Sequence, residues 1–112
     1  MKTSRVLATI ALTAVPMPDA SASEIQGIVI DFRARASDGL HYLQVTGART
    51  ARPACATQDY FVLRDENSRA GQSQIAQILT AQASGRSVFI LGSGSCTRWG
   101  DGEDIESVKI LP

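Results

Sequence analysis

The chain contains few aromatic residues, histidines and cysteines. Only 5% of its 112 residues are aromatic, and it has one Trp, one His and two Cys. No Ser/His/Asp or Cys/His arrangement for nucleophilic catalysis can be assembled around the single His41, and no metal-ligand spacing is present. The composition therefore predicts a protein that is not an enzyme and that uses neither a metal nor another cofactor.

An excess of charge and a long apolar run are also lacking. The chain carries 11 basic and 11 acidic residues, so it has no basic surface of the kind that nucleic acids or anionic membranes select. The apolar stretch at residues 6–15 is about half as long as the roughly 20 residues that span a bilayer. We therefore expect no nucleic-acid partner and no membrane insertion.

The first 22 residues have the pattern of an export signal. Lys2 and Arg5 precede the apolar stretch, and the Ala-Ser-Ala sequence at residues 20–22 is a small-x-small cleavage site. The pattern predicts that residues 1–22 are a signal peptide and that residues 23–112 form one small domain, periplasmic or secreted. A domain of this size buries little more than about 60% of its unfolded surface, so a covalent crosslink is expected to help it fold.

Cys55 and Cys96 both lie in the predicted domain. Export places them in an oxidising compartment, where two thiols have one intramolecular pairing. A Cys55–Cys96 disulfide closes a loop of about 40 residues and stabilises the fold by roughly 4 kcal/mol in the chain-entropy view. The alternatives are a free reactive thiol and a metal-binding pair.

Hydrophobic patterning predicts five strands. In the first, GIVIDFRARA, alternation places Ile28, Ile30 and Phe32 on the buried face. Asp38-Gly39 then predicts a tight hairpin turn. The predicted strands cover residues 27–36, 40–46, 59–64, 87–91 and 105–111, with a bulge near residue 106.

A helix is predicted between the third and fourth strands. Asn67 or Ser68 can cap its amino terminus and Gly85 its carboxyl terminus. Its apolar stripe has helical spacing and consists of Ile75, Ile78, Leu79 and Ala83. The fold is therefore expected to be mainly β with one helix, in the order β-β-β-α-β-β of the OB-fold, a five-stranded Greek-key barrel. An open α+β sandwich is the alternative.

The segment SGSCTRWGDGEDIE at residues 93–106 joins the last two predicted strands. Ligands of OB barrels bind on the face of strands two and three, beside this loop and the loop between strands one and two. Trp99 offers an apolar platform and Arg98 a forked donor, while Asp101, with Glu103 and Asp104, offers acceptors. With Tyr42 on strand two, the predicted ligand-binding residues are Trp99, Arg98, Asp101 and Tyr42. The alternative is that Trp99 folds back over the barrel end.

The acidic residues of this segment have further interpretations. The DGED spacing lacks the alternating oxygen ligands of a calcium-binding EF-hand loop, and a Glu103/Glu106 acid–base pair is no more than any acidic turn provides. The acids are expected to keep the loop solvated and to discourage edge pairing. We expect the disulfide to fix the base of the loop and to leave residues 99–104 mobile. Arg33 and Arg35 are a further candidate anion site, with solvated strand charges as the common alternative.

Several segments together resemble one family. GIVIDF, then HYLQV, a Cys before the third strand and ILTAQASGRSVFI are similar to the B subunits of the subtilase cytotoxin and typhoid toxin group, over about residues 27–91. The resemblance implies an OB barrel, assembly into a ring-shaped homopentamer, binding of sialylated glycans and a separate catalytic A subunit. It assigns no sugar-contacting residue in this chain, and Cys96 has no counterpart in the family pattern.

The expected function is therefore that of a periplasmic or secreted, non-catalytic module that recognises a carbohydrate. The alternative is a small periplasmic protein that binds or inhibits another protein without contacting a glycan. Loss of a glycan response in Trp99→Ala distinguishes the first from the second.

Overall fold

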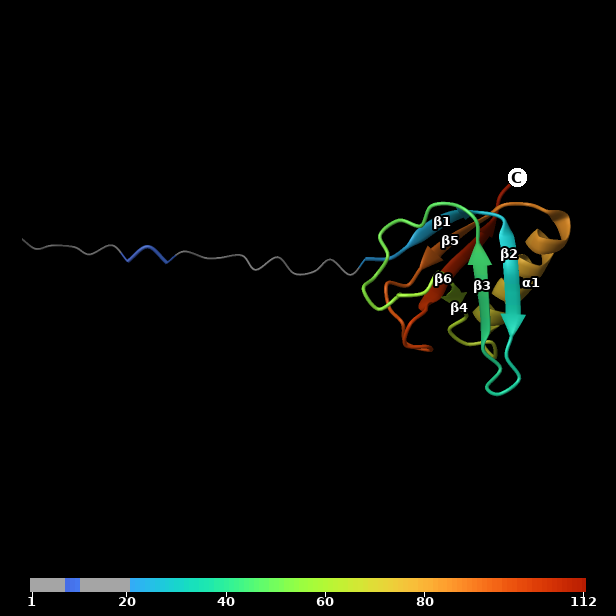
Figure 1. Cartoon of the computed structure of the whole chain (residues 1–112), viewed down its shortest axis with the longest axis horizontal. Helices are drawn as coiled ribbons and strands as arrows, with labels where there is room; N and C mark the ends of the chain where they lie inside the picture. Colours follow the sequence, from blue (N-terminus) through green and yellow to red (C-terminus); the bar gives the residue numbers. More distant parts are fainter. Residues whose placement is uncertain (1–7, 11–20) are drawn as a thin grey trace, which may run out of the picture.

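The computed structural model describes residues 8–10 and 21–112, so most of the predicted signal peptide at residues 1–22 lies outside the described residues. Residues 23–112 contain six strands and one helix (Figure 1). The elements are β1 (Glu24–Gly27), β2 (Val29–Ala34), β3 (His41–Val45), β4 (Phe61–Val62), α1 (Arg69–Ser84), β5 (Val88–Gly92) and β6 (Glu103–Ile110). The predicted mainly β fold with one helix is confirmed.

The strands form one sheet in the order β1-β5-β6-β4-β3-β2. Neighbouring strands are antiparallel except β4 and β6, which are parallel. β1 and β2 are the two end strands, so these pairings do not close the sheet as the predicted barrel requires. The two end strands are nonetheless consecutive in the chain, with only Ile28 between them. Ile28 donates from its backbone N to Thr46 Oγ1 at 2.8 Å and accepts from the Thr46 backbone N at 2.9 Å.

The alternation predicted for the first strand is reversed at its start. A register shift between Val29 and Asp31 changes which side chains face inward. Val29 is buried, whereas Ile28 and Ile30 are 37% and 60% exposed. Phe32, beyond the shift, packs against the core as expected. The expectation that Ile28 and Ile30 are buried was therefore wrong, because strict alternation cannot anticipate an inserted residue.

Helix α1 has the predicted ends. Ser68 Oγ accepts from the Gly71 backbone N at 2.9 Å, and Gly85 ends the helix in the left-handed conformation, with φ of 68°. Of the predicted stripe, Ile78 is buried and Ile75 packs against the core, but Leu79 is half exposed and Ala83 is exposed, and Ala81 is buried instead. A pattern of period 3.6 leaves this choice of neighbouring positions open, and packing on β6 and β2 selects the stripe.

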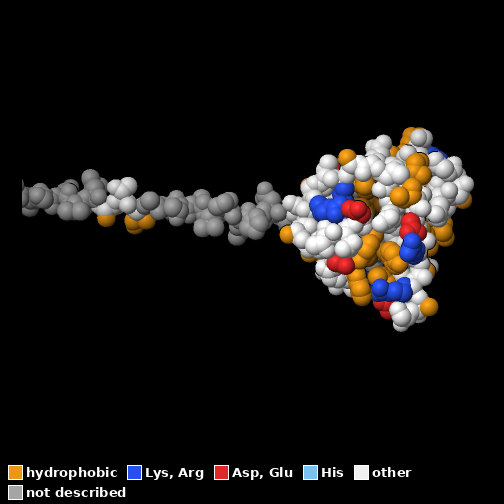
Figure 2. Space-filling view, in the orientation of Figure 1, with side chains coloured by type: hydrophobic (Ala, Val, Ile, Leu, Met, Phe, Trp, Pro, Cys, Tyr) orange, Lys and Arg blue, Asp and Glu red, His pale blue; other side chains and the backbone are white. Residues whose placement is uncertain are grey.

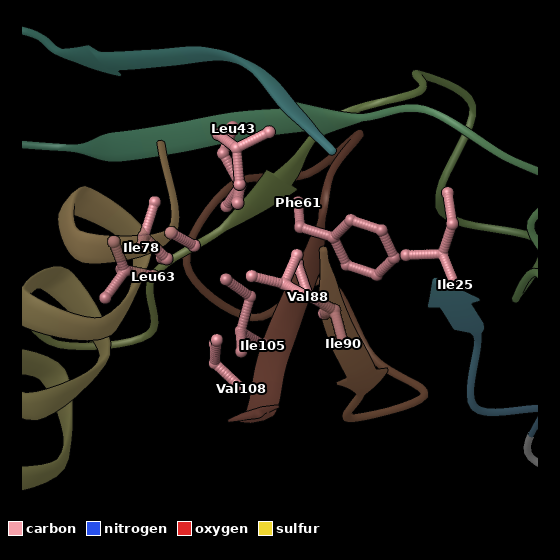
Figure 3. Packing of buried hydrophobic residues seen from close by; sticks show 11 residues of the cluster. Ile25, Leu43, Phe61, Leu63, Ile78, Val88, Ile90, Ile105 and Val108 are labelled. Carbon is pink, nitrogen blue, oxygen red and sulfur yellow. The ribbon is translucent and has the colours of Figure 1, made fainter. Parts of the chain in front are cut away.

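The core lies between α1 and the sheet. Figure 3 shows Ile78 and Leu63 at its helix side, and Ile25 at its far end beside the Phe61 ring. The buried members of the cluster are Ile25, Val29, Leu43, Phe61, Leu63, Ile78, Ala81, Val88, Ile90, Ile105 and Val108. Both ends of the sheet and the helix thus share one apolar cluster, which fixes the loops around it.

The predicted Cys55–Cys96 disulfide is confirmed, with a Cα–Cα distance of 6.1 Å. It connects the long segment between β3 and β4 to the segment between β5 and β6. In the part of the chain that the structure describes, no helix has the length and apolar character needed to cross a membrane.

Candidate functional site

The segment between β5 and β6 is held by a buried carboxylate at the start of β6. Asp104 is fully buried and accepts hydrogen bonds from the backbone N atoms of Thr97, at 3.1 Å, and Arg98, at 3.2 Å, and from the Thr97 hydroxyl. A carboxylate that accepts several such donors fixes the backbone that carries them. Asp104 thereby positions the residues immediately before Trp99.

A second buried carboxylate lies beside it in sequence but has different partners. Glu103 Oε1 accepts from Arg49 Nη2 at 2.8 Å, and Oε2 accepts from the backbone N atoms of Gly94 at 2.8 Å and Ser23 at 3.1 Å. A side chain at Gly92 would collide with this carboxylate, so the position requires glycine. Burial by itself would raise the pKa of Glu103, but these hydrogen bonds outweigh it and hold the pKa below its ordinary value.

The expectation that the acidic residues keep this loop solvated was wrong for two of them. Glu103 and Asp104 belong to β6 and are buried in separate hydrogen-bond networks, whereas Asp101 is partly exposed and Glu106 is exposed. Within residues 8–10 and 21–112, no group of three or more His, Cys, Asp or Glu side chains is arranged to hold a metal ion.

Trp99 and Asp101 line a cleft of about 260 Å³. Its wall comes from the β2–β3 hairpin, β3, the residue before β4 and the β5–β6 segment. The lining residues are Arg35, Leu40, Tyr42, Tyr60, Trp99 and Asp101. On the face shown in Figure 2, hydrophobic side chains gather over the middle and lower part of the domain, with charged side chains around them. The cleft thus combines three aromatic rings with one cation and one carboxylate.

The register of β3 and β4 explains why two tyrosines meet there. Tyr42 lies opposite Val62, and Leu43 lies opposite the buried Phe61. Directly paired residues share a face and successive residues alternate, so Tyr42 and Tyr60 both lie on the face away from the core. Their ring centroids are 5.4 Å apart.

The backbone of the β5–β6 segment packs closely on Tyr60. A Cβ atom at Gly102 would lie 2.5 Å from Tyr60 Cε2, so only glycine allows this approach. The Tyr60 hydroxyl donates a hydrogen bond to Asp101 Oδ1. Burial, together with this hydrogen bond, raises the pKa of Tyr60 to about 12. Tyr60 is therefore a neutral donor that fixes one oxygen of the Asp101 carboxylate.

Arg35 forms the opposite wall. Its Nε and Nη2 atoms donate to the two carboxylate oxygens of Asp38 at 3.0 and 2.6 Å, and its Cζ lies 4.2 Å from the Trp99 ring centroid. The hydrogen bond from Arg35 lowers the pKa of Asp38 to about 2. A bidentate ion pair stacked on an indole holds the guanidinium and the ring in a defined relation.

Arg98, the fourth residue predicted for ligand binding, does not line the cleft. Its Nη1 donates to Glu66 Oε2 and to the backbone oxygens of Leu63 at 3.4 Å and Arg64 at 3.2 Å. Glu66 also accepts from the His41 backbone N at 2.7 Å. Arg98 therefore ties the β5–β6 segment to the turn before α1.

The sequence predicts Tyr42, Trp99 and Asp101 as ligand-binding residues. It does not predict that Arg35, Leu40 and Tyr60 line the same cleft. A signal for Tyr60 was present, since it lies next to the apolar pair that forms β4 and alternates with the buried Phe61. Arg35 was predicted only as part of a candidate anion site with Arg33, or as a solvated strand charge. Its position over Trp99 depends on two loops from distant parts of the chain.

A second cleft, of about 290 Å³, lies toward the other end of β3 and includes Ile25, Ile30, Gln44, Arg49 and Arg52. Its cations are already paired, Arg49 with Glu103 and Arg52 with Asp59 at 2.6 Å. Among the described residues, no aromatic side chain lines it. It therefore offers a ligand fewer stacking contacts than the cleft at Trp99.

In comparisons with known proteins, no family model matches the chain, and no curated protein or solved structure matches it.

Proposed function

We propose that the chain is a non-catalytic binding module that recognises a carbohydrate in the cleft at Trp99. The observation that carries the proposal is the convergence of Tyr42, Tyr60 and Trp99 with Arg35 and Asp101 around one concave surface. Apolar faces of sugar rings stack on aromatic side chains, and their hydroxyls need both donors and acceptors, which these residues supply.

The topology supports an OB-type interpretation of this cleft. If β1 and β2 are counted as one strand interrupted at Ile28, the chain has the order of three strands, a helix and two strands, with parallel pairing between the third and the last. In such folds the ligand face lies on strands two and three between two particular loops. The cleft at Trp99 takes its residues from the corresponding places, β3, the residue before β4, the β2–β3 hairpin and the β5–β6 segment.

The size and charge of the cleft narrow the range of sugars that we expect it to bind. Its volume of about 260 Å³ is just below the roughly 300–1,000 Å³ of drug-sized sites, which suits one sugar ring at the end of a chain. The positive charge of Arg35 is balanced by its ion pair with Asp38, and Asp101 adds a further negative charge to the cleft. This balance favours a neutral sugar over the sialylated glycan that the family resemblance implies.

A glycan array probed with the processed protein tests the proposal. We expect binding to glycans with a neutral terminal sugar, and loss of that binding in Trp99→Ala. Leu79→Ala is the matched control, because Leu79 is a large apolar side chain that is 50% exposed on α1, outside the cleft. Absence of any glycan signal, or equal signals from wild type and Trp99→Ala, would rule out this site.

A protein partner is the second candidate, favoured by a different surface. Ile28 and Ile30 are exposed apolar side chains at one end of the sheet, and a contiguous exposed patch of such side chains marks a contact with another protein. The toxin-like interpretation adds a homopentamer with a separate catalytic subunit. Native mass spectrometry tests the oligomeric state. A homopentamer would support the toxin-like interpretation, and a monomer would contradict it.

The disulfide is compatible with a location outside the cytoplasm. Together with the signal-like first 22 residues, it leads us to propose that the module acts in the periplasm or after secretion. Fractionation of cells that express the full chain tests this location, and retention of the whole protein in the cytoplasm would contradict it.

A further inference from the structure

We infer that the buried Glu103 carboxylate binds a new amino terminus. This terminus is created by hydrolysis of the Ala22–Ser23 peptide bond. The inference combines the predicted cleavage sequence with the buried surroundings of Ser23, and it is independent of what the cleft binds. It assigns a processing site whose product is a structural part of the folded domain.

Ser23 is held as tightly as a core residue although it precedes the first strand. It is fully buried, and its backbone O accepts from the Gly92 backbone N at 2.7 Å. Its Oγ accepts from Arg49 Nε at 2.9 Å, and its backbone N donates to Glu103 Oε2 at 3.1 Å. Every polar atom of Ser23 thus has a partner on another part of the chain.

The Ser23 nitrogen faces the buried Glu103 carboxylate, which also pairs with the Arg49 guanidinium. In the uncleaved chain this nitrogen is an amide, a neutral donor to a buried carboxylate. Hydrolysis adds water across the Ala22–Ser23 bond, so that Ala22 leaves with a carboxylate and the Ser23 nitrogen becomes an ammonium. The water is supplied by solvent and the catalyst is a signal-type peptidase of the export system. The hydrogen bond to Glu103, whose acceptor is already ionised, then gains an ionised donor as well and becomes an ion pair.

Removal of the residues before Ser23 exposes one side of the new amino terminus to solvent. Ser21 and Ala22 are only half-buried, and the Ser21 backbone O lies 3.0 Å from where a Cβ at Gly94 would be. Cleavage removes these two residues from the surface above Gly94. The ammonium can then donate to Glu103 on one side and be hydrated on the other, which limits the cost of burying its charge.

The burial of Ser23 also determines whether cleavage or folding comes first. A peptidase needs an extended, accessible bond, and the Ala22–Ser23 bond ends at a fully buried residue once the domain has folded. Cleavage must therefore precede docking of Ser23 beneath Arg49. This order agrees with export of an unfolded chain followed by folding of residues 23–112.

Two measurements test the inference. Mass spectrometry of the protein exported from the full chain should give a mature form that begins at Ser23, and a different first residue overturns the proposal. The processed form is then compared with the same chain retaining Ala22, which moves the ammonium one residue outward. We expect retention of Ala22 to lower the midpoint of thermal unfolding by about 4–8 °C, the shift typical of a small domain losing one such interaction.

Glu103→Gln separates this effect from general packing. It keeps the size of the side chain but removes its charge, so the difference in midpoint between the two amino-terminal forms should disappear. Equal midpoints with Glu103 intact would overturn the proposal, and so would an undiminished difference in Glu103→Gln. If Glu103→Gln does not fold, equal midpoints of the two wild-type forms still overturn the proposal.

Discussion

The guanidinium carbon of Arg35 lies 4.2 Å from the centroid of the Trp99 ring, a contact between residues 64 positions apart in the chain. Arg35 belongs to the β2–β3 hairpin and Trp99 to the β5–β6 segment. Asp38 holds the guanidinium from the hairpin side, while Asp104 holds the backbone before Trp99. The two loops that border the cleft are therefore positioned independently and meet at one cation–aromatic contact.

This contact predicts that Asp38 controls the environment of the chain's one tryptophan. In Asp38→Asn the guanidinium loses its charged partner, so we expect a shift in Trp99 fluorescence emission and weaker protection of Trp99 from a soluble quencher. Asp31→Asn is the matched control, because Asp31 pairs with the exposed Arg33. Identical emission in wild type and Asp38→Asn would show that the stack does not depend on the ion pair.

The same pair predicts a pH dependence. The pKa of Asp38 is lowered to about 2 from an ordinary value of 3.8, so its contribution is fully present above 3.8 and is lost as pH falls through about 2. The emission of Trp99 should stay constant on acidification until pH approaches this lower value. A transition centred near 3.8 would contradict the lowered pKa.

Tyr60 offers a second test of the cleft, by titration. The chain has two tyrosines, so Tyr42→Phe leaves Tyr60 as the only source of tyrosinate absorbance. We expect that absorbance to appear near pH 12, because burial and the hydrogen bond to Asp101 raise the pKa of Tyr60 to about this value. Adding Asp101→Asn removes the carboxylate acceptor and should lower the titration midpoint. An unchanged midpoint would indicate that burial alone causes the shift.

The buried ion pair between Arg49 and Glu103 predicts a large loss of stability when one partner is removed. Their side chains are 4% and 0% exposed, and the Arg49 guanidinium also lies 4.0 Å from the Phe61 ring centroid. Removal of Arg49 leaves the buried Glu103 carboxylate with the Ser23 and Gly94 nitrogens as donors, and breaking a buried ion pair in this way costs about 3–5 kcal/mol. We expect this loss for Arg49→Met in urea denaturation. Asp59→Asn, which removes the exposed partner of Arg52, is the control and should have little measurable effect.

The sign of the pH dependence of this pair follows from Glu103. Its pKa is held below the ordinary 4.5, so the stabilisation is present above 4.5 and is lost as pH falls through the lower value in the folded protein. The free energy of unfolding of the wild type should therefore decline below pH 4.5, and that of Glu103→Gln should decline less. Parallel curves would show that other carboxylates dominate acid unfolding.

Some features of the fold and of the site could be predicted from the sequence, and others could not. The helix ends at Ser68 and Gly85 were predictable because local hydrogen bonding and a left-handed φ determine them. The disulfide was predictable because two cysteines have one pairing. The burial of Glu103 was not, since its partners Arg49 and Ser23 come from distant segments. The burial of Asp104 was not either, since its bonds to Thr97 and Arg98 depend on how the loop folds back on β6. A carboxylate in a Gly-rich acidic turn looks the same in sequence whether it is solvated or buried.

The Cys55–Cys96 disulfide gives the last prediction, which concerns both stability and the cleft. It joins the segment before β4 to the β5–β6 segment three residues before Trp99, and the neighbouring hydrogen bond from the Gln58 backbone N to the Asp101 O, at 3.2 Å, follows the same path. Replacing both cysteines by Ala removes a crosslink worth roughly 4 kcal/mol, so the midpoint of urea unfolding should fall accordingly. Asp104 still holds the backbone of Thr97 and Arg98, and we therefore expect the Trp99 emission of the folded variant to match that of the wild type. Changed emission in the folded variant would mean that the disulfide, rather than Asp104, positions the aromatic wall of the cleft.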